Sequence, residues 1–210
     1  MARDIGAVLQ ILFFILIVKP VLLIILGMRV KGLENLPKKG PAILIANHNS
    51  HLDTLVLMNL FKLRRLQRVR PVAAADYFLK GKVRAWLSQN VMHIIPIERT
   101  ASGSDPLVPI YEALERDEIV IFYPEGSRGE PEQIQPFKKG IAKLCSKYPD
   151  VPTYPIFMKG LGRALPKGDP ILVPFFCDVV IDGPTTCASA KCDDFSVFLY
   201  ERILSLKIME

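Results

Sequence analysis

The N-terminal part of the chain is almost wholly apolar, and this run limits the possible folds more than any other feature. It covers residues 5–28, of which 17 are Leu, Ile, Val or Phe. At central positions each contributes about 0.3–0.6 kcal/mol to insertion into a bilayer, whereas one Lys costs roughly 3 kcal/mol. The apolar residues therefore outweigh Lys19, and the sequence predicts a helical segment that associates with a membrane.

Lys19 and Pro20 interrupt this run near its middle, which leaves two arrangements open. The run is about long enough to span a bilayer as one helix kinked at the proline. Alternatively, its two halves, each too short to cross, dip into one leaflet as a helical pair, and the interruption favours this second arrangement. In either case the cations after the run predict that the remainder lies on the cytoplasmic side. These cations are Arg29, Lys31, Lys38 and Lys39.

The size and composition of the chain fit one globular domain behind this segment. Its 210 residues allow a single substantial core, so we divide it into a membrane-associating helical segment at residues 1–31 and one domain at residues 32–210. The net charge of +6 suits nucleic acid or anionic lipid. Aromatic residues are not interleaved with the basic ones as in a base-stacking groove. We therefore expect membrane lipids as partners and no nucleic acid.

A cluster of polar side chains at residues 47–53 (Asn-His-Asn-Ser-His-Leu-Asp) lies between two apolar stretches, residues 42–46 and 55–58. This pattern predicts a strand, a loop and then a helix, a junction at which α/β folds often expose reactive groups. An imidazole is mostly a free base near pH 7 and removes protons best when a carboxylate holds one ring nitrogen. His48 and Asp53 are therefore the candidate catalytic pair.

Two other interpretations of these residues remain open. Asp53 is also a favoured residue for capping the helix that follows. His48, His51 and Asp53 could bind a metal ion, but His93 lies in a different segment and no Cys is nearby. The four cysteines include no C-x-x-C pair or zinc spacing, which favours a reducing, cytosol-facing environment. We expect no metal and no cofactor.

The rest of the chain alternates between probable strands and helices. We expect strands at residues 93–97 and 118–122, an irregular edge strand at 151–159 because of Pro152 and Pro155, and late strands at 171–176 and 178–181. A helix follows Asp105, and another closes the chain at residues 193–209. The sequence has no Walker A motif, dinucleotide fingerprint or Gly-x-Ser-x-Gly elbow.

Four stretches together resemble the sequence blocks of the glycerolipid acyltransferase family, which contains the 1-acylglycerol-3-phosphate acyltransferases. Residues 47–53 resemble its first block, 94–99 its second, 122–128 (Phe-Tyr-Pro-Glu-Gly-Ser-Arg) its third and 151–156 its fourth, in the family's order and spacing. Ser127 stands where Thr is commoner, and Gly129 where Ser is common. The resemblance covers roughly residues 30–160 and implies an α/β fold, a mixed sheet flanked by helices.

The resemblance also implies a reaction and a set of site residues. His48, oriented by Asp53, would take the proton from a free hydroxyl of a lysophospholipid, whose oxygen then attacks the carbonyl of an acyl-CoA or acyl-ACP thioester. Substrate-binding residues would be Arg99, Glu125, Gly126, Ser127 and Arg128. The expected product is phosphatidic acid from 1-acylglycerol-3-phosphate. Acylation of another lysophospholipid or amphipathic alcohol, or a non-catalytic lipid-binding role at the membrane surface, are the alternatives.

Overall fold

The structure is a computed structural model that describes residues 2–78, 81–98, 103, 105–169, 171–190, 192 and 194–208. Its α-helices are α1 (Ala2–Phe13), α2 (Lys19–Ile24), α3 (Leu52–Asn59), α4 (Ala75–Phe78), α5 (Lys82–Asn90), α6 (Val108–Glu115), α7 (Gly140–Lys147), α8 (Leu161–Ala164) and α9 (Phe195–Ile208). A π-helical turn, η1 (Phe14–Val18), and two 3-10 helices, η2 (Leu33–Asn35) and η3 (Leu63–Arg68), lie between them. The strands are β1 (Leu26–Lys31), β2 (Ala42–Ala46), β3 (Val69–Ala74), β4 (Ile95–Ile97), β5 (Ile119–Phe122), β6 (Thr153–Lys159) and β7 (Phe175–Ile181).

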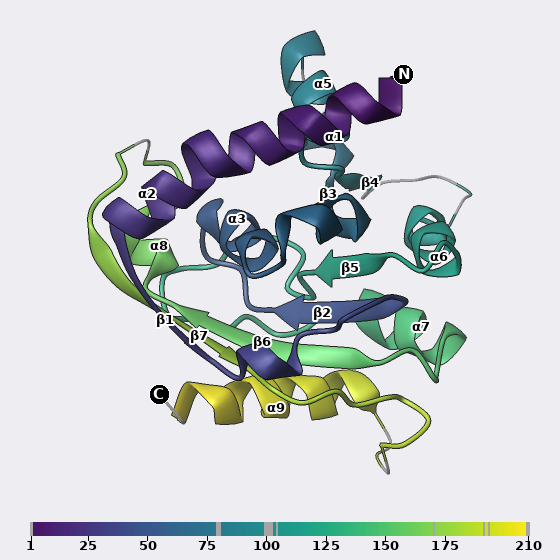
Figure 1. The fold of residues 1–210 in the computed structure, drawn as a ribbon. Coiled ribbons are helices and arrows are strands. Elements are labelled where there is room, and N and C mark those ends of the chain that lie inside the picture. The colour runs from purple at the N-terminus through teal and green to yellow at the C-terminus, as the bar shows by residue number, and fades with distance from the viewer. Residues whose placement is uncertain are drawn as a thin grey trace.

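The strands form one mixed sheet in the order β1-β7-β6-β2-β5-β3-β4 (Figure 1). Pairing is parallel throughout except between β6 and β7. This confirms the predicted fold class. The carboxyl ends of β6, β2, β5, β3 and β4 consequently meet at one edge of the sheet, which brings together the loops that follow them.

Helices cover both faces of the sheet, and β2 contributes to the core on each side. Ala42, Leu44 and Ala46 pack in one apolar cluster with α3 and the N-terminal helix. Ile43 and Ile45 pack in a second cluster with α6, α7 and α9. All five residues of β2 are buried, which explains why the strand reads as an uninterrupted apolar run. Figure 1 shows α1 and α3 on one side of the sheet and α9 on the other.

The N-terminal apolar run forms one helix, and the predicted helical pair is wrong. A continuous helix covers Ile5–Ile24, the one helix in the described residues that is long and apolar enough to cross a membrane by length and composition. Pro20 lacks an N–H donor, and the π-helical turn η1 directly before it changes the hydrogen-bonding register without breaking the helix. The interruption in the sequence is therefore accommodated within the helix.

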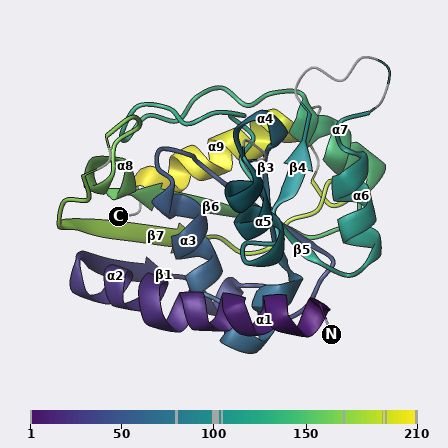
Figure 2. The ribbon, with the colours of Figure 1, turned by 90° about the horizontal axis from the view of Figure 1, so that it is seen from above.

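One face of this helix is fixed to the domain. Gln10, Phe14, Val18 and Leu22 recur every four residues, and all four are buried. The last residues of the predicted 1–31 segment are not helical, because Leu26–Lys31 forms the edge strand β1, paired with β7. The boundary at residue 31 is therefore wrong: the helix ends near Ile24, and the apolar residues after it belong to the sheet. Figure 2 shows α1 and α2 lying along the body of the protein.

Two predictions for the C-terminal part of the chain also differ from the structure. β6 is an interior strand between β2 and β7, although Pro152 and Pro155 suggested an edge. Pro155 still serves as an acceptor, because its carbonyl oxygen receives a hydrogen bond from Asp182 N at 2.9 Å. Residues 171–174 are irregular instead of a strand, and Val173 N donates to the carbonyl oxygen of Ala164 beside α8. The single strand β7 begins only at Phe175.

Candidate active site

The loop after β2 is held in place by an asparagine that continues the sheet through its side chain. Asn47 Nδ2 donates to Met158 O at 2.8 Å, and Met158 N donates to Asn47 Oδ1 at 2.8 Å. This buried amide pairs with both the N–H and the carbonyl group of Met158 in β6, as a neighbouring strand residue would. It thereby fixes the direction in which the chain leaves the sheet. The next residue, His48, is thereby directed to the carboxyl edge.

His48 and Asp53 meet, as predicted. His48 Nδ1 lies 2.9 Å from Asp53 Oδ2. The same oxygen accepts hydrogen bonds from Asn49 N at 2.7 Å and Ser50 N at 2.9 Å. The Asp53 side chain is only 2% exposed, against 18% for His48. A carboxylate at Nδ1 favours the tautomer with its proton there, which leaves Nε2 as a free base.

Asp53 does not cap α3. The helix begins at Leu52 with His51 at the N-cap, so Asp53 lies in the first turn. Its position there lets one carboxylate bind the backbone of the loop and the imidazole at once. The carboxylate also lies close to the positive end of the helix dipole, a favourable position for a negative charge.

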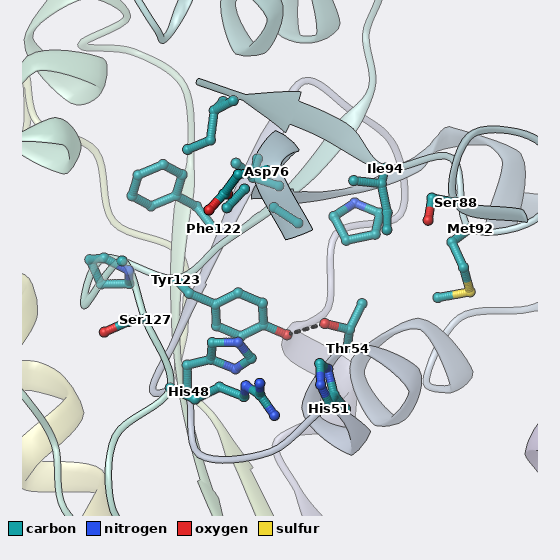
Figure 3. A pocket seen from close by; sticks show the side chains of 18 of the residues that line it. His48, His51, Thr54, Asp76, Ser88, Met92, Ile94, Phe122, Tyr123 and Ser127 are labelled. Atoms are coloured by element: carbon teal, nitrogen blue, oxygen red, sulfur yellow. Dashed lines mark hydrogen bonds between the residues drawn. The ribbon is translucent and has the colours of Figure 1, made fainter. Parts of the chain in front are cut away.

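Tyr123 supports the other side of His48, and sequence reasoning missed it. β5 is the parallel neighbour of β2, with Ile45 opposite Phe122, so the residue after β5 lies level with the His48 loop. The two rings are stacked with centroids 4.0 Å apart and planes 16° apart. Tyr123 Oη lies 2.9 Å from Thr54 Oγ1 on α3. Figure 3 shows the tyrosine ring over the imidazole and its hydroxyl directed to Thr54.

Glu125 joins the loop after β5 to the His48 loop. It is buried, and its two carboxylate oxygens accept hydrogen bonds from His48 N at 2.9 Å and Gln135 N at 3.1 Å. Gly129 N donates to His48 O at 2.8 Å, which adds a second link between the loops. Burial raises the pKa of Glu125 to about 7, against the lowering effect of the two N–H donors. Glu125 does not line the cavity described below, so this geometry favours a bracing role over the predicted contact with substrate.

A cavity of about 900 Å³ is lined by His48 and by three of the predicted binding residues, Gly126, Ser127 and Arg128. Gly126 has a φ of 73°, and a Cβ there would lie 2.8 Å from Lys138 Nζ, so the backbone needs glycine. Lys138 and Lys167 also line the cavity. Lys167 could not be predicted, because no local pattern marks it and only the fold brings it to this wall.

The remaining wall of the cavity is largely apolar. It comes from β3, α5 and the N-terminal helix, and includes Phe13, Val72, Leu87, Val91 and Met92. A cavity of this size, with a mainly apolar lining and polar side chains among it, is typical of a site for a small amphipathic molecule. The predicted Arg99 lies outside the described residues, although the preceding Glu98 lines the cavity.

A second hollow lies at the opposite, amino ends of β2 and β5. It is lined by Lys38, Lys39 and three arginines of η3, and none of the predicted site residues reaches it. Among the residues that the structure describes, no group of three or more His, Cys, Asp or Glu side chains is arranged to hold a metal ion. The carboxyl-edge cavity is therefore the candidate active site.

Comparisons with known proteins identify the family of the chain. A sequence model of the acyltransferase family matches residues 27–159, a range that includes His48, Asp53 and the Glu125 loop. The chloroplastic 1-acyl-sn-glycerol-3-phosphate acyltransferase BAT2 of Brassica napus is 32% identical over 142 residues, which cover 66% of this chain and 39% of that protein. The 1-acyl-sn-glycerol-3-phosphate acyltransferase alpha of Bos taurus is 25% identical over 168 residues, covering 79% of this chain and 56% of that protein.

A solved structure shows the same fold. The crystal structure of the 1-acyl-sn-glycerophosphate acyltransferase PlsC from Thermotoga maritima matches with a TM-score of 0.72 and 20% identity, covering 90% of this chain and 74% of that chain. This chain spans about two fifths of the length of the plant relative and just over half of the bovine one. The family match nevertheless covers more than half of the 210 residues. The chain belongs to the acyltransferase family.

Proposed function

We propose that the protein transfers a fatty acyl chain from an acyl thioester to the free hydroxyl of 1-acylglycerol-3-phosphate, which gives phosphatidic acid. The observation that carries this proposal is the arrangement of one cavity: the carboxylate-bound imidazole of His48 and three cationic residues line it, and the rest of its wall is mainly apolar. The relatives named above are 1-acyl-sn-glycerol-3-phosphate acyltransferases.

His48 is the proposed general base. Nε2 takes the proton of the acceptor hydroxyl while its oxygen forms a bond to the thioester carbonyl carbon. The resulting imidazolium is stabilised by Asp53 and returns the proton to the thiolate of CoA or acyl carrier protein as the carbon–sulfur bond breaks. General-base help of this kind contributes about 10²–10⁴ in rate, and no cofactor enters the step.

Transfer is proposed to be direct, without an acyl-enzyme. Burial raises the pKa of the Cys145 thiol to about 12, and that of Cys177 to about 12 as well, so both are poor nucleophiles near neutral pH. No cysteine is among the described residues that line the cavity. The acceptor oxygen itself is therefore the attacking nucleophile.

The phosphate of the acceptor is proposed to bind the cations at the cavity, Arg128, Lys138 and Lys167. An Arg can bind two phosphate oxygens at once, and a Lys adds a compact charge. Arg99, predicted from the family pattern, remains a further proposed phosphate contact. The glycerol and acyl parts would then lie along Ser127 and the apolar wall.

Membrane association is proposed to occur through the outer face of the Ile5–Ile24 helix. Large apolar side chains are exposed there, including Leu12, Leu16 and Leu23. The opposite face is buried against the domain, so a helix held in this way lies in the plane of one leaflet instead of crossing it. The cations after the helix support a cytoplasmic position of the domain.

The test is acyl transfer by purified His48→Ala protein from labelled acyl-CoA to lysophosphatidic acid. We expect a loss of at least a hundredfold in kcat, with unchanged thermal unfolding and unchanged flotation with liposomes. Unchanged turnover would refute the base assignment. A parent protein that floats but acylates no acceptor in a panel of lysophospholipids and alcohols would instead be a lipid-binding protein.

The acceptor assignment has its own test. Arg128→Ala and Lys167→Ala should each raise the KM for lysophosphatidic acid by about tenfold or more, since each removes a charged contact to phosphate. Neither should change the KM for monoacylglycerol, which has no phosphate. Equal effects on both acceptors would contradict phosphate binding at these residues.

A further inference from the structure

Residues 171–176 form a run of six apolar residues, of which only Leu172 packs partly against the core. Their sequence is Ile-Leu-Val-Pro-Phe-Phe. Phe176 is 84% exposed and Ile171 is 65% exposed, and Val173 and Phe175 are exposed as well. Proteins rarely leave several consecutive large apolar residues in water unless the surface contacts something else.

This run adjoins the exposed end of the N-terminal helix. Leu26 pairs with Phe175 and Gly27 with Phe176, so β1 and β7 place the two segments side by side. A Cβ on Gly27 would collide with the Phe176 ring, which shows how closely this ring covers the glycine. Leu23 and Ile24, directly before β1, are 85% and 80% exposed. Figures 1 and 2 both show α2 beside the segment that leads into β7.

We propose that residues 171–176 are a second membrane-contacting element that enters the same leaflet as the exposed face of the N-terminal helix. The inference rests on the membrane association proposed above and extends it to a part of the chain about 150 residues away. Two contacts side by side fix the orientation of the domain on the bilayer, whereas one helix lying flat leaves the domain free to roll about the helix axis.

The chemistry of the segment fits the interfacial region of a bilayer. Phe175 and Phe176 provide the aromatic surface common at that depth. Arg163 lies over the Phe175 ring, with Cζ 5.8 Å from its centroid, so the segment carries a cation beside its aromatic surface, as contact with anionic headgroups favours. Two N–H groups of the irregular backbone have partners within the chain, because Ile171 N donates to Asp169 Oδ1 at 2.9 Å and Val173 N to Ala164 O at 2.8 Å. Bonded backbone groups make shallow burial in lipid possible.

The segment also connects the membrane to the active site. Lys167, four residues before Ile171, lines the cavity and donates through Nζ to the carbonyl oxygen of Arg128 at 3.2 Å. Anchoring residues 171–176 would therefore hold the phosphate-binding end of the cavity at a set height above the leaflet.

The experiment places a fluorescent reporter in the segment. Phe176→Trp in a Trp86→Phe background gives a protein whose sole tryptophan is at position 176, since the chain has one Trp. It is mixed with vesicles of phosphatidylcholine and phosphatidylglycerol, with or without bromine on the acyl chains. We expect a blue shift and at least twofold quenching by the brominated lipid. Val197→Trp in the same background is the control, because Val197 is half exposed on α9, across the sheet from the helix.

Partition into the same vesicles gives a second measurement. Phe176→Asp should lower it by about tenfold or more, whereas Val197→Asp should change it by less than twofold. A protein that floats but shows no quenching at position 176 would overturn this inference and leave the helix anchor intact. A protein that does not float would overturn both. Dimers in solution that dissociate on Phe176→Asp, without quenching by lipid, would assign the patch to a second copy of the chain instead.

Discussion

Substituting Asp53 by Asn tests the central interaction of the proposed site with little change in shape. The amide oxygen can still accept from Asn49 N and Ser50 N, so the loop should keep its conformation. The substitution removes the negative charge that lies 2.9 Å from His48 Nδ1. At an effective dielectric constant of about 20, this charge stabilises an imidazolium by about 6 kcal/mol before solvation is considered.

The expected effect on catalysis follows from bounds on that energy. A hydrogen bond to a charged group exceeds a neutral one by about 1–1.5 kcal/mol, which sets a lower limit of roughly tenfold in kcat. The electrostatic figure sets an upper limit of roughly 10⁴-fold. Because Asp53 is almost fully buried, water screens its charge only weakly. We therefore expect a loss of kcat in the upper half of this range.

The assay is thiol release from acyl-CoA at saturating lysophosphatidic acid, with thermal unfolding as the control for structure. A twofold change or less in kcat, in a variant that unfolds at the parent temperature, would refute the argument that Asp53 stabilises a charged imidazole. A loss of hundredfold or more with an unchanged KM would place the effect in the transition state.

Three further predictions concern the surroundings of His48 and the fold. Because burial raises the pKa of Glu125 from 4.5 to about 7, the folded protein keeps a proton that the unfolded chain loses in this window. Stability should therefore fall by roughly 3 kcal/mol as pH rises from about 4.5 to 7, and urea unfolding of Glu125→Gln should show this slope removed. Tyr123→Phe keeps the ring stack on His48 and loses the hydrogen bond to Thr54, so the free energy of unfolding should fall by about 0.5–1.5 kcal/mol. The kcat should stay within tenfold of the parent value. A larger loss of kcat would give the hydroxyl a direct role in catalysis. Gly32→Ala should lower the free energy of unfolding by about 2–4 kcal/mol, because φ is 73° and its Cβ would meet the Ile181 carbonyl oxygen; a neutral effect would disprove that crowding.

The region around the active site could be predicted from sequence because its signals are local. An apolar strand, a polar loop and an apolar helix follow one another within residues 42–60, and the structure has β2, the His48 loop and α3 there. The loop after β5 was equally evident from the apolar strand before it. Parallel pairing of β2 and β5 then brings the two loops together, a step that needs the sheet order.

Several features could not be predicted because their signal is spatial. Tyr123 and Lys167 acquire their positions only through the pairing of distant strands and loops. The role of Glu125 as a brace depends on burial, which its position in a polar turn does not indicate. Prolines in β6 suggested an edge, but pairing with β2 and β7 on either side overrides that local preference.

The N-terminal run was misjudged at both of its ambiguous points. Lys19 and Pro20 suggest a helix break in the sequence. In the structure a π-helical turn before them accommodates the N–H group that Pro20 lacks, and the helix continues. Residues 26–31 continue the apolar composition of the helix, and composition does not separate a buried helix from an edge strand. Membrane association and its orientation remain predictions that the vesicle experiments address.

Phe13 belongs both to the apolar N-terminal helix and to the wall of the cavity that contains His48. For an enzyme held on a bilayer by that helix, acceptor molecules arrive by lateral diffusion and need not pass through water. The quantity that sets the rate is then the number of acceptors per unit area of leaflet. Diluting the acceptor with inert lipid would then slow turnover even at constant total concentration, so synthesis by such an enzyme would respond to the lipid composition of the leaflet.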